Sequence, residues 1–132
     1  SYLETNVKEN NSSVKPVMAD ALEICETFAD GELDLIVSNP PYIKSADIET
    51  LLKEVRLEPR LALDGGEDGC DFYREIVSRW SRKLKKGGAL AFELGENQAD
   101  AVKALMTDKG FSDFKISLDF GGVQRAIIGT LL

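Results

Sequence analysis

The stretch "DLIVSNPPYIKS", residues 34–45, joins an apolar run to a polar corner that is rich in proline. The segment "LDLIVS" (33–38) is almost entirely aliphatic and β-branched, which predicts a central parallel strand covered on both faces. The motif "NPPY" (39–42) follows at once. Because open α/β sheets bind ligands beyond the carboxyl ends of their strands, the motif occupies a position that is typical of a binding site.

The four residues of the NPPY motif suit the positioning of a planar nitrogen that carries two hydrogens. The side-chain carbonyl of Asn39 can accept a hydrogen bond from one N–H, and the main-chain carbonyl of Pro40 can accept from the other. Pro41 fixes the following turn, and the ring of Tyr42 can lie flat against the planar group. Methyl transfer from an activated donor depends chiefly on proximity and orientation, so this corner is a candidate catalytic and substrate-binding site. The alternative is a simple strand end, because Asn-Pro also opens turns.

The rest of the chain alternates strand-like and helix-like segments, which predicts an α/β fold with a mostly parallel sheet. After the tail of a helix and a polar turn, strands are expected at residues 14–18, 33–38, 89–94, 114–120 and 125–132. The last two are expected to form an antiparallel pair. Helices are expected at residues 20–30, 46–55, 71–86 and 97–109, with an irregular arm at 56–69.

The helix at 71–86 is expected to end in Lys85 and Lys86 and to be terminated by the glycine pair 87–88. Trp80 lies in its apolar stripe and is predicted to be core. The basic cluster around the end of this helix is interpreted as a solvated helix end rather than a nucleic-acid site; its members are Arg79, Arg82, Lys83, Lys85 and Lys86.

Composition narrows the possible functions. The 132 residues suffice for one domain, and 43% are hydrophobic and 30% charged, as in ordinary globular proteins. The net charge of −7 disfavours nucleic acid as a partner, and no apolar run is long enough to indicate a membrane partner. Histidine is absent and no metal site is predicted. Cys25 and Cys70 are predicted to be small buried residues of a cytoplasmic protein.

Beyond the motif itself, longer stretches of the sequence resemble those of a known family. Three stretches are similar, in their residues and in their spacing, to the release factor glutamine methyltransferases of the PrmC/HemK type. They are "NPPYI", "EVRLEPRLALDGGEDGCDFYREIV" (54–77) and "LKKGGALAFELGENQ" (84–98). The resemblance runs from about Val14 to the end of the chain. It implies transfer of a methyl group from S-adenosyl-L-methionine to the glutamine side-chain nitrogen in the Gly-Gly-Gln motif of peptide chain release factors.

Residue by residue, the resemblance implies that Asn39 and the Pro40 carbonyl grip the substrate amide, with Tyr42 packed beside it. Glu58 and the "DGGEDG" arm (64–69) would help to shape the substrate mouth. An acidic, solvated loop is an equally good interpretation for any single residue of that arm.

The same resemblance implies cofactor contacts near the first strand. Asp20 would accept a hydrogen bond from the adenine amino group, with Ala21 beside it, and Asn39 would face the cofactor from the other side. Asp20, followed by Glu23, also has the pattern of a helix N-cap, and it could serve both purposes.

The chain departs from the family at its front. The glycine loop, the acidic residue that holds the ribose and the N-terminal helical domain are not found. We therefore expect residues 1–132 to be the C-terminal part of a class I methyltransferase catalytic domain with a partial Rossmann-like sheet that lacks its first two strands. The open edge of the 33–38 strand is expected to pair with the 14–18 strand or with a second chain as a dimer. This chain alone is expected to be inactive and to bind the cofactor weakly or not at all.

Two other functions stay open at this stage. The NPPY motif is shared with nucleic-acid methyltransferases that act on adenine N6 or cytosine N4, although the acidic composition argues against them. A non-catalytic Rossmann-like module would use the same fold without chemistry.

Overall fold

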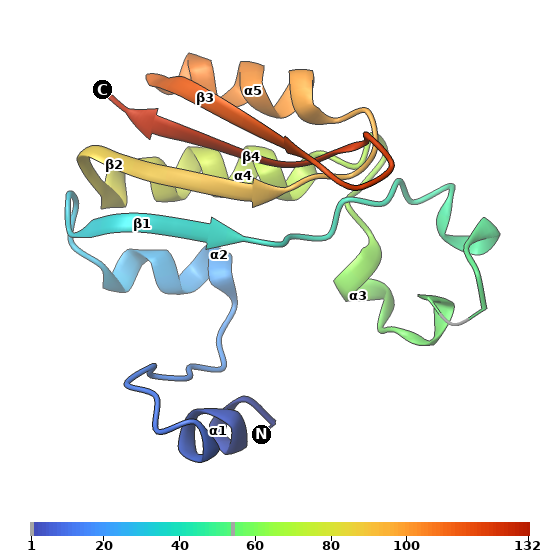
Figure 1. The fold of residues 1–132 in the computed structure, drawn as a ribbon, viewed down its shortest axis with the longest axis horizontal. Helices are drawn as coiled ribbons and strands as arrows, with labels where there is room; N and C mark the ends of the chain where they lie inside the picture. Colours follow the sequence, from blue (N-terminus) through green and yellow to red (C-terminus); the bar gives the residue numbers. More distant parts are fainter. Residues whose placement is uncertain (1, 54) are drawn as a thin grey trace.

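The computed structural model describes residues 2–53 and 55–132. Its centre is a mixed sheet with the strand order β1-β2-β4-β3 (Figure 1). The strands are β1 (Leu33–Ser38), β2 (Leu84–Glu93), β3 (Phe111–Leu118) and β4 (Gln124–Leu131). β1 runs parallel to β2, whereas β4 is antiparallel to both β2 and β3. The structure thus confirms an α/β fold with a partial Rossmann-like sheet that ends in an antiparallel hairpin.

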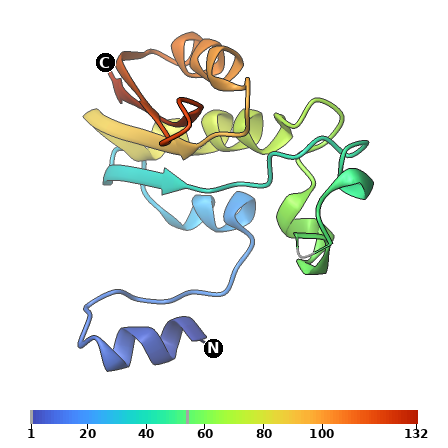
Figure 2. The ribbon, with the colours of Figure 1, turned by 45° about the vertical axis from the view of Figure 1, so that its right-hand side comes forward.

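The helices are short. They are α1 (Tyr2–Glu9), α2 (Ala21–Ile24), α3 (Arg60–Leu63), α4 (Asp71–Trp80) and α5 (Ala99–Asp108), with single 3-10 turns at η1 (Cys25–Thr27), η2 (Ile48–Thr50), η3 (Val55–Leu57) and η4 (Ser81–Lys83). Helices α2, α4 and α5 lie on one face of the sheet, whereas α1 lies away from it and α3 lies in the arm beyond the strand ends (Figures 1 and 2). The core lies between the sheet and helices α4 and α5, where Tyr73, Val77 and Val102 pack against Leu90 and Phe92 of β2. Among the helices of the described residues, none has the length and apolar character needed to cross a membrane.

β1 lies at the edge of the sheet, and one of its faces is open. Ile36 packs against the core, but Leu35 and Val37 point the other way and are 54% and 69% exposed. The prediction that both faces of this strand are covered is therefore wrong for the part of the chain that the structure describes, because α2, α4 and α5 all pack on the side of Ile36.

The predicted strand at 14–18 is not a strand. Val14, Val17 and Met18 are exposed, and the segment pairs with no other strand of the described residues, so it does not close the edge of β1. Pro16 lacks an N–H group and would interrupt a ladder of hydrogen bonds, which explains why the segment gains little from pairing. Pairing of that edge with a second chain stays a prediction.

Two helix predictions also need correction. Among its described residues, 46–53 and 55, the segment 46–55 contains the η2 turn and the beginning of η3 and no amphipathic α-helix. The helix expected to reach Lys86 ends at Trp80, and β2 begins at Leu84, which pairs with Leu33 of β1. Between that pair and the next pair, Leu35 with Ala89, residues 85–88 form a bulge opposite a single residue of β1. Lys85 and Lys86 thus lie on a bulged strand rather than at a helix end.

The basic cluster is engaged in ion pairs. The pairs are Arg79–Glu75, Arg82–Glu26, Lys83–Asp30 and Lys85–Asp34, with N–O distances of 2.5–2.8 Å. Lys83 departs from the solvated interpretation because its side chain is buried and also donates to the carbonyl of Phe28. These pairs offset the charges of four of the five members, all except the exposed Lys86, which argues against a nucleic-acid surface there.

Other predictions are confirmed. Cys25 and Cys70 are buried and free, the 3-10 turn η1 continues the helix that begins after Asp20, and α5 and the β3–β4 hairpin lie where expected. Trp80 is partly buried at the margin of the core, where it contacts Phe28 and donates from Nε1 to the carbonyl of Ala21.

Candidate functional site

The NPPY segment begins at the carboxyl end of β1, beside the carboxyl end of β2. Both strands point towards the arm that carries α3, as Figures 1 and 2 show from two directions. The arm is joined to residues 43–45, which directly follow the NPPY segment, by hydrogen bonds from Ile43 N to Leu63 O (3.0 Å), from Gly65 N to Ile43 O (2.8 Å) and from Ser45 N to Gly66 O (2.9 Å). The arm therefore forms one wall of any pocket at this end of the sheet.

A pocket of about 350 Å³ opens between the segment and the arm. Its polar lining comes from Asn39, Tyr42 and Glu58, three of the residues that the sequence singled out. The apolar remainder of its lining consists of Ile43, Val55, Ala62 and Leu63. The structure thus brings together residues that lie up to nineteen positions apart and surrounds their polar groups with an apolar wall.

Asn39 and Pro40 both offer acceptors that the protein leaves unused. The Asn39 side chain is exposed, and among the described residues its amide makes no hydrogen bond. The ring of Pro40 is buried, and its carbonyl likewise accepts nothing from the described residues. Pro41 is half-buried and outside the pocket lining. The Asn39 side-chain carbonyl is therefore available to a ligand in the pocket, whereas Pro40 is buried and does not line the pocket, so a contact between its carbonyl and a ligand stays a prediction.

Tyr42 is half-buried at the back of the pocket and is held by its hydroxyl. The O–H donates to Oε1 of Glu93, at the carboxyl end of β2, over 3.0 Å. Burial raises the pKa of Tyr42, and the hydrogen bond to the Glu93 carboxylate and its charge raise this pKa further. The ring stays neutral at physiological pH, so it can act as a flat apolar surface with a fixed end.

Three glycines allow other chain segments to approach the NPPY segment closely. A Cβ atom on Gly65 would lie 2.8 Å from the Tyr42 Cα and 2.9 Å from the carbonyl oxygen of Pro41. On Gly69 it would lie 2.5 Å from the carbonyl oxygen of Tyr42, and on Gly95 it would lie 2.9 Å from the Tyr42 ring. The "DGGEDG" stretch thus packs closely against the NPPY segment, and its role in shaping the substrate mouth stays a prediction.

Sequence reasoning missed Glu93, the last residue of β2, and Gly95 and Gln98, which follow that strand. Gln98 donates from Nε2 to the carbonyl of Tyr42 over 2.9 Å. A signal was available: the rule that directs attention to the residues after β1 applies equally to the residues after β2, its parallel neighbour.

The predicted cofactor residues Asp20 and Ala21 do not line this pocket. Asp20 is the N-cap of α2 and accepts from Leu22 N through Oδ1 over 2.7 Å. Its Oδ2 accepts no hydrogen bond within the described residues, so this exposed carboxylate can still bind an amino group. In Figures 1 and 2 the start of α2 lies at the same end of the sheet as the carboxyl end of β1. Such a placement fits a ligand that extends from Asp20 towards Asn39.

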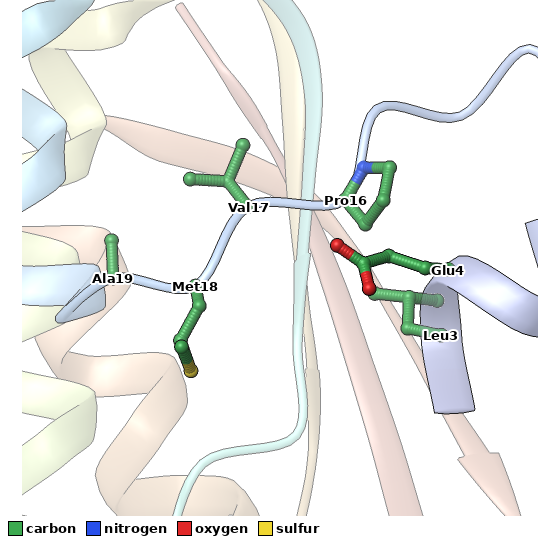
Figure 3. Close-up of a pocket in the computed structure, with 6 residues that line it drawn as sticks. All are labelled: Leu3, Glu4, Pro16, Val17, Met18 and Ala19. Atoms are coloured by element: carbon green, nitrogen blue, oxygen red, sulfur yellow. The ribbon is translucent and has the colours of Figure 1, made fainter. Parts of the chain in front are cut away.

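A second hollow, of about 500 Å³, lies between α1 and the residues that precede α2 (Figure 3). Leu3 and Glu4 line it from one side and the stretch from Pro16 to Ala19 from the other. Apart from Glu4, its described lining has no polar side chain that could orient a planar amide. It offers nothing to the chemistry considered above.

Neither cysteine is placed for nucleophilic chemistry. Cys70 is buried, and burial raises the pKa of its thiol, as does the negative charge of Asp68. A protonated thiol in such a position is inert at neutral pH. No cluster of three His, Cys, Asp or Glu side chains suited to a metal ion occurs within residues 2–53 and 55–132.

Comparison with known proteins gives one consistent result. No family model matches the chain. The release factor glutamine methyltransferase of Geobacter sulfurreducens is 49% identical over 107 residues, which cover 80% of this chain and 38% of that protein. The corresponding protein of Clostridium acetobutylicum is 38% identical over 127 residues, covering 96% of this chain and 42% of its own length.

A solved structure agrees with these relatives. It is the release-factor-specific protein-(glutamine-N5) methyltransferase of Alicyclobacillus acidocaldarius, which is 28% identical, with a TM-score of 0.51 over 83% of this chain and 54% of that one. The chain spans about two fifths of the length of the two curated relatives above. Its sequence, its sheet and the position of its NPPY segment all lead to the same assignment. The chain belongs to the release factor glutamine methyltransferase family.

Proposed function

We propose that this chain forms the substrate-binding part of an S-adenosylmethionine-dependent methyltransferase that methylates a glutamine side-chain amide of peptide chain release factors. The observation that carries the proposal is the pocket in which Asn39, Tyr42 and Glu58 meet. The names of the relatives support the choice of substrate, since they are release factor glutamine methyltransferases.

The chemistry needs orientation rather than a strong base. A carboxamide nitrogen has a delocalised lone pair, so it reacts only when it is held in line with the methyl group. Hydrogen bonds from its two N–H groups to the Asn39 and Pro40 carbonyls would fix it, and the Tyr42 ring would hold the amide plane. The same carbonyl dipoles stabilise the positive charge that develops on the nitrogen in the transition state.

S-adenosylmethionine, when bound, supplies a methyl group that is activated by a sulfonium centre. Asp20 would hold its adenine amino group through Oδ2, with Ala21 beside it, and Asn39 would separate the cofactor from the substrate amide. Asp20 fits this role because its helix-capping bond uses only one carboxylate oxygen. Because release factors act in translation, we place the reaction in the cytoplasm.

The proposal is tested with Asn39→Ala in the full-length protein. The rate of methyl transfer to a release factor should fall about 10²- to 10³-fold, because one of two positioning acceptors is lost. The melting temperature should stay unchanged, since the Asn39 side chain is exposed and makes no hydrogen bond within the described residues. Asn6→Ala, which also changes an exposed asparagine, is the control and should keep the full rate.

The choice of substrate is tested in a separate experiment. The wild-type protein should methylate a release factor and leave duplex DNA unmodified under the same conditions. Efficient methylation of adenine or cytosine would instead support the nucleic-acid alternative, and full activity of the Asn39→Ala variant would support a non-catalytic role for the segment.

A further inference from the structure

Gln98 lies in the turn between β2 and α5 and is 8% exposed. Its side-chain amide makes four hydrogen bonds. Nε2 donates to the carbonyl of Tyr42 over 2.9 Å and to the carbonyl of Gly69 over 3.2 Å. Oε1 accepts from Gly95 N over 3.0 Å and from the Tyr73 hydroxyl over 3.3 Å. Both N–H donors of the Gln98 amide are therefore used inside the protein.

The orientation of this amide follows from its partners. A main-chain N–H can only donate, so the side of the amide that faces Gly95 must be the oxygen. Main-chain carbonyls can only accept, so the side that faces Tyr42 and Gly69 must be the nitrogen. An isosteric carboxylate would place oxygen against these two carbonyls, which is why this position requires an amide.

The bonds of Gln98 join three segments that are distant in sequence. They are the NPPY segment, the "DGGEDG" arm and the turn after β2. Tyr42 is attached to this turn twice: its carbonyl is held by Gln98, and its hydroxyl donates to Glu93. On the core side of the turn, the single hydroxyl proton of Tyr73 is shared between the carbonyl of Glu93 (2.9 Å) and Oε1 of Gln98 (3.3 Å).

Sterics alone do not hold the segment at these contacts. Gly65 and Gly69 present only backbone to it, and Gly95 has no side chain towards the Tyr42 ring. Glycine surfaces allow close approach, but they provide no interlocking side chains. At these glycine contacts the bonds from Gln98 to the Tyr42 and Gly69 carbonyls supply direction, in addition to the backbone hydrogen bonds that join residues 43–45 to the arm.

We propose that Gln98 is a positioning residue for methyl transfer, which fixes the NPPY segment so that its acceptors and the Tyr42 ring meet the substrate amide. The inference rests on the proposed function and deepens it. Gln98 is buried behind the segment and does not line the pocket of Asn39 and Tyr42. It acts on the reaction only through Tyr42 and its neighbours.

The test compares Gln98→Met with two controls in the full-length protein. Methionine keeps the volume of the side chain but removes all four hydrogen bonds. Val102 lies one helical turn along α5 and is fully buried, and its side chain forms no hydrogen bond. Val102→Ala therefore lowers stability while all the hydrogen bonds of Gln98 are kept. Tyr73→Phe removes one of the two bonds that Gln98 Oε1 accepts, together with the bond to the Glu93 carbonyl, and keeps both bonds that Gln98 Nε2 donates to Tyr42 and Gly69.

Two measurements are made on each variant. Hydrogen exchange reports on the Ile43 and Ser45 amides, which bond to the arm, and methylation kinetics report kcat and KM for the release factor. In Gln98→Met we expect exchange at both amides to rise at least tenfold. We expect kcat to fall about 10²-fold, with KM within threefold of wild type, because a small misplacement of reacting groups has this effect. Val102→Ala and Tyr73→Phe should retain wild-type exchange at Ile43 and wild-type kcat at 25 °C.

The outcomes are distinguishable. Unchanged exchange at Ile43 in Gln98→Met, or a kcat equal to that of Val102→Ala, would overturn the positioning role. If the wild type fails to methylate any release factor, the proposed function is wrong, while exchange at Ile43 still decides whether Gln98 holds the segment. Should Gln98→Met fail to fold, Gln98→Asn, which is too short to reach Tyr42, is measured against the same expectations.

Discussion

Substitution of Gly65 by alanine tests whether the site depends on close backbone contact. The added Cβ would lie 2.8 Å from the Tyr42 Cα and 2.9 Å from the carbonyl oxygens of Pro41 and Gly69. All three atoms belong to the backbone, so no side chain can rotate away to relieve the contact. The φ angle of Gly65 is not positive, so alanine brings a steric effect without a conformational one.

The size of the effect follows from these distances. Contacts of about 3.4 Å or more are ordinary for a Cβ atom, so the NPPY segment and the arm must separate by roughly half an ångström. Overpacking of this kind costs about 1–3 kcal/mol in stability. The same displacement moves the acceptors of Asn39 and Pro40, and we expect the rate of methyl transfer to fall about 10²-fold, equivalent to about 2.7 kcal/mol in the transition state.

The assay is methyl transfer to a release factor at 25 °C, with the folded fraction measured by thermal unfolding of each variant. Gly31→Ala is a matched control, because Gly31 has a φ of 68° and open space around its Cβ position. Alanine there costs about 1 kcal/mol in stability through backbone strain, and Gly31 precedes the start of β1, whereas the NPPY segment follows its end. Gly31→Ala should keep the wild-type rate. A Gly65→Ala protein with wild-type rate and stability would refute the steric argument.

Further predictions concern Tyr42 and Asp20. Because the pKa of Tyr42 is raised in the folded state, its contribution to stability is present below about pH 10, where the unfolded tyrosine ionises, and is lost as pH rises through the folded pKa. Urea unfolding between pH 8 and 11 should show this loss of stability, and the loss should be smaller in Tyr42→Phe. Asp20→Ala should cost about 0.5–2 kcal/mol, because Leu22 N loses its capping partner. Asp20→Asn should keep that stability but raise the KM for S-adenosylmethionine, and an unchanged KM in both variants would leave Asp20 as a cap only.

The elements that the sequence predicted correctly are those whose local pattern of residues is compatible with only one secondary structure. The β3–β4 pair follows from two strand-like runs joined by a short glycine-containing turn, and α5 follows from an apolar stripe that ends in Gly110. The start of α2 follows from Asp20, because an N-cap side chain accepts hydrogen bonds from the N–H groups of the residues that follow it. In each case the residues that decide the element lie within the element or next to it.

The wrong boundaries have a non-local cause. The run from Asp71 to Lys86 has a helical apolar pattern throughout, but Leu84 gains more from pairing with Leu33 of β1 than from another helical turn. The segment 14–18 has the composition of a strand, yet Pro16 weakens its hydrogen-bonding edge. Neither outcome is decided by residues inside the segment alone, so local periodicity could not predict it.

The same distinction explains why only part of the site was predictable. Asn39 and Tyr42 have side chains whose chemistry suits a planar amide, and both follow a recognisable strand. Gln98 gives no such indication, because a glutamine before a helix has many uses, and its partners Tyr42 and Gly69 lie 56 and 29 residues away. A reaction that depends on orientation needs both kinds of residue: those that touch the amide and those that hold them still. Because the supports act through backbone carbonyls and through the absence of side chains, their role becomes visible only when the three segments are seen packed together.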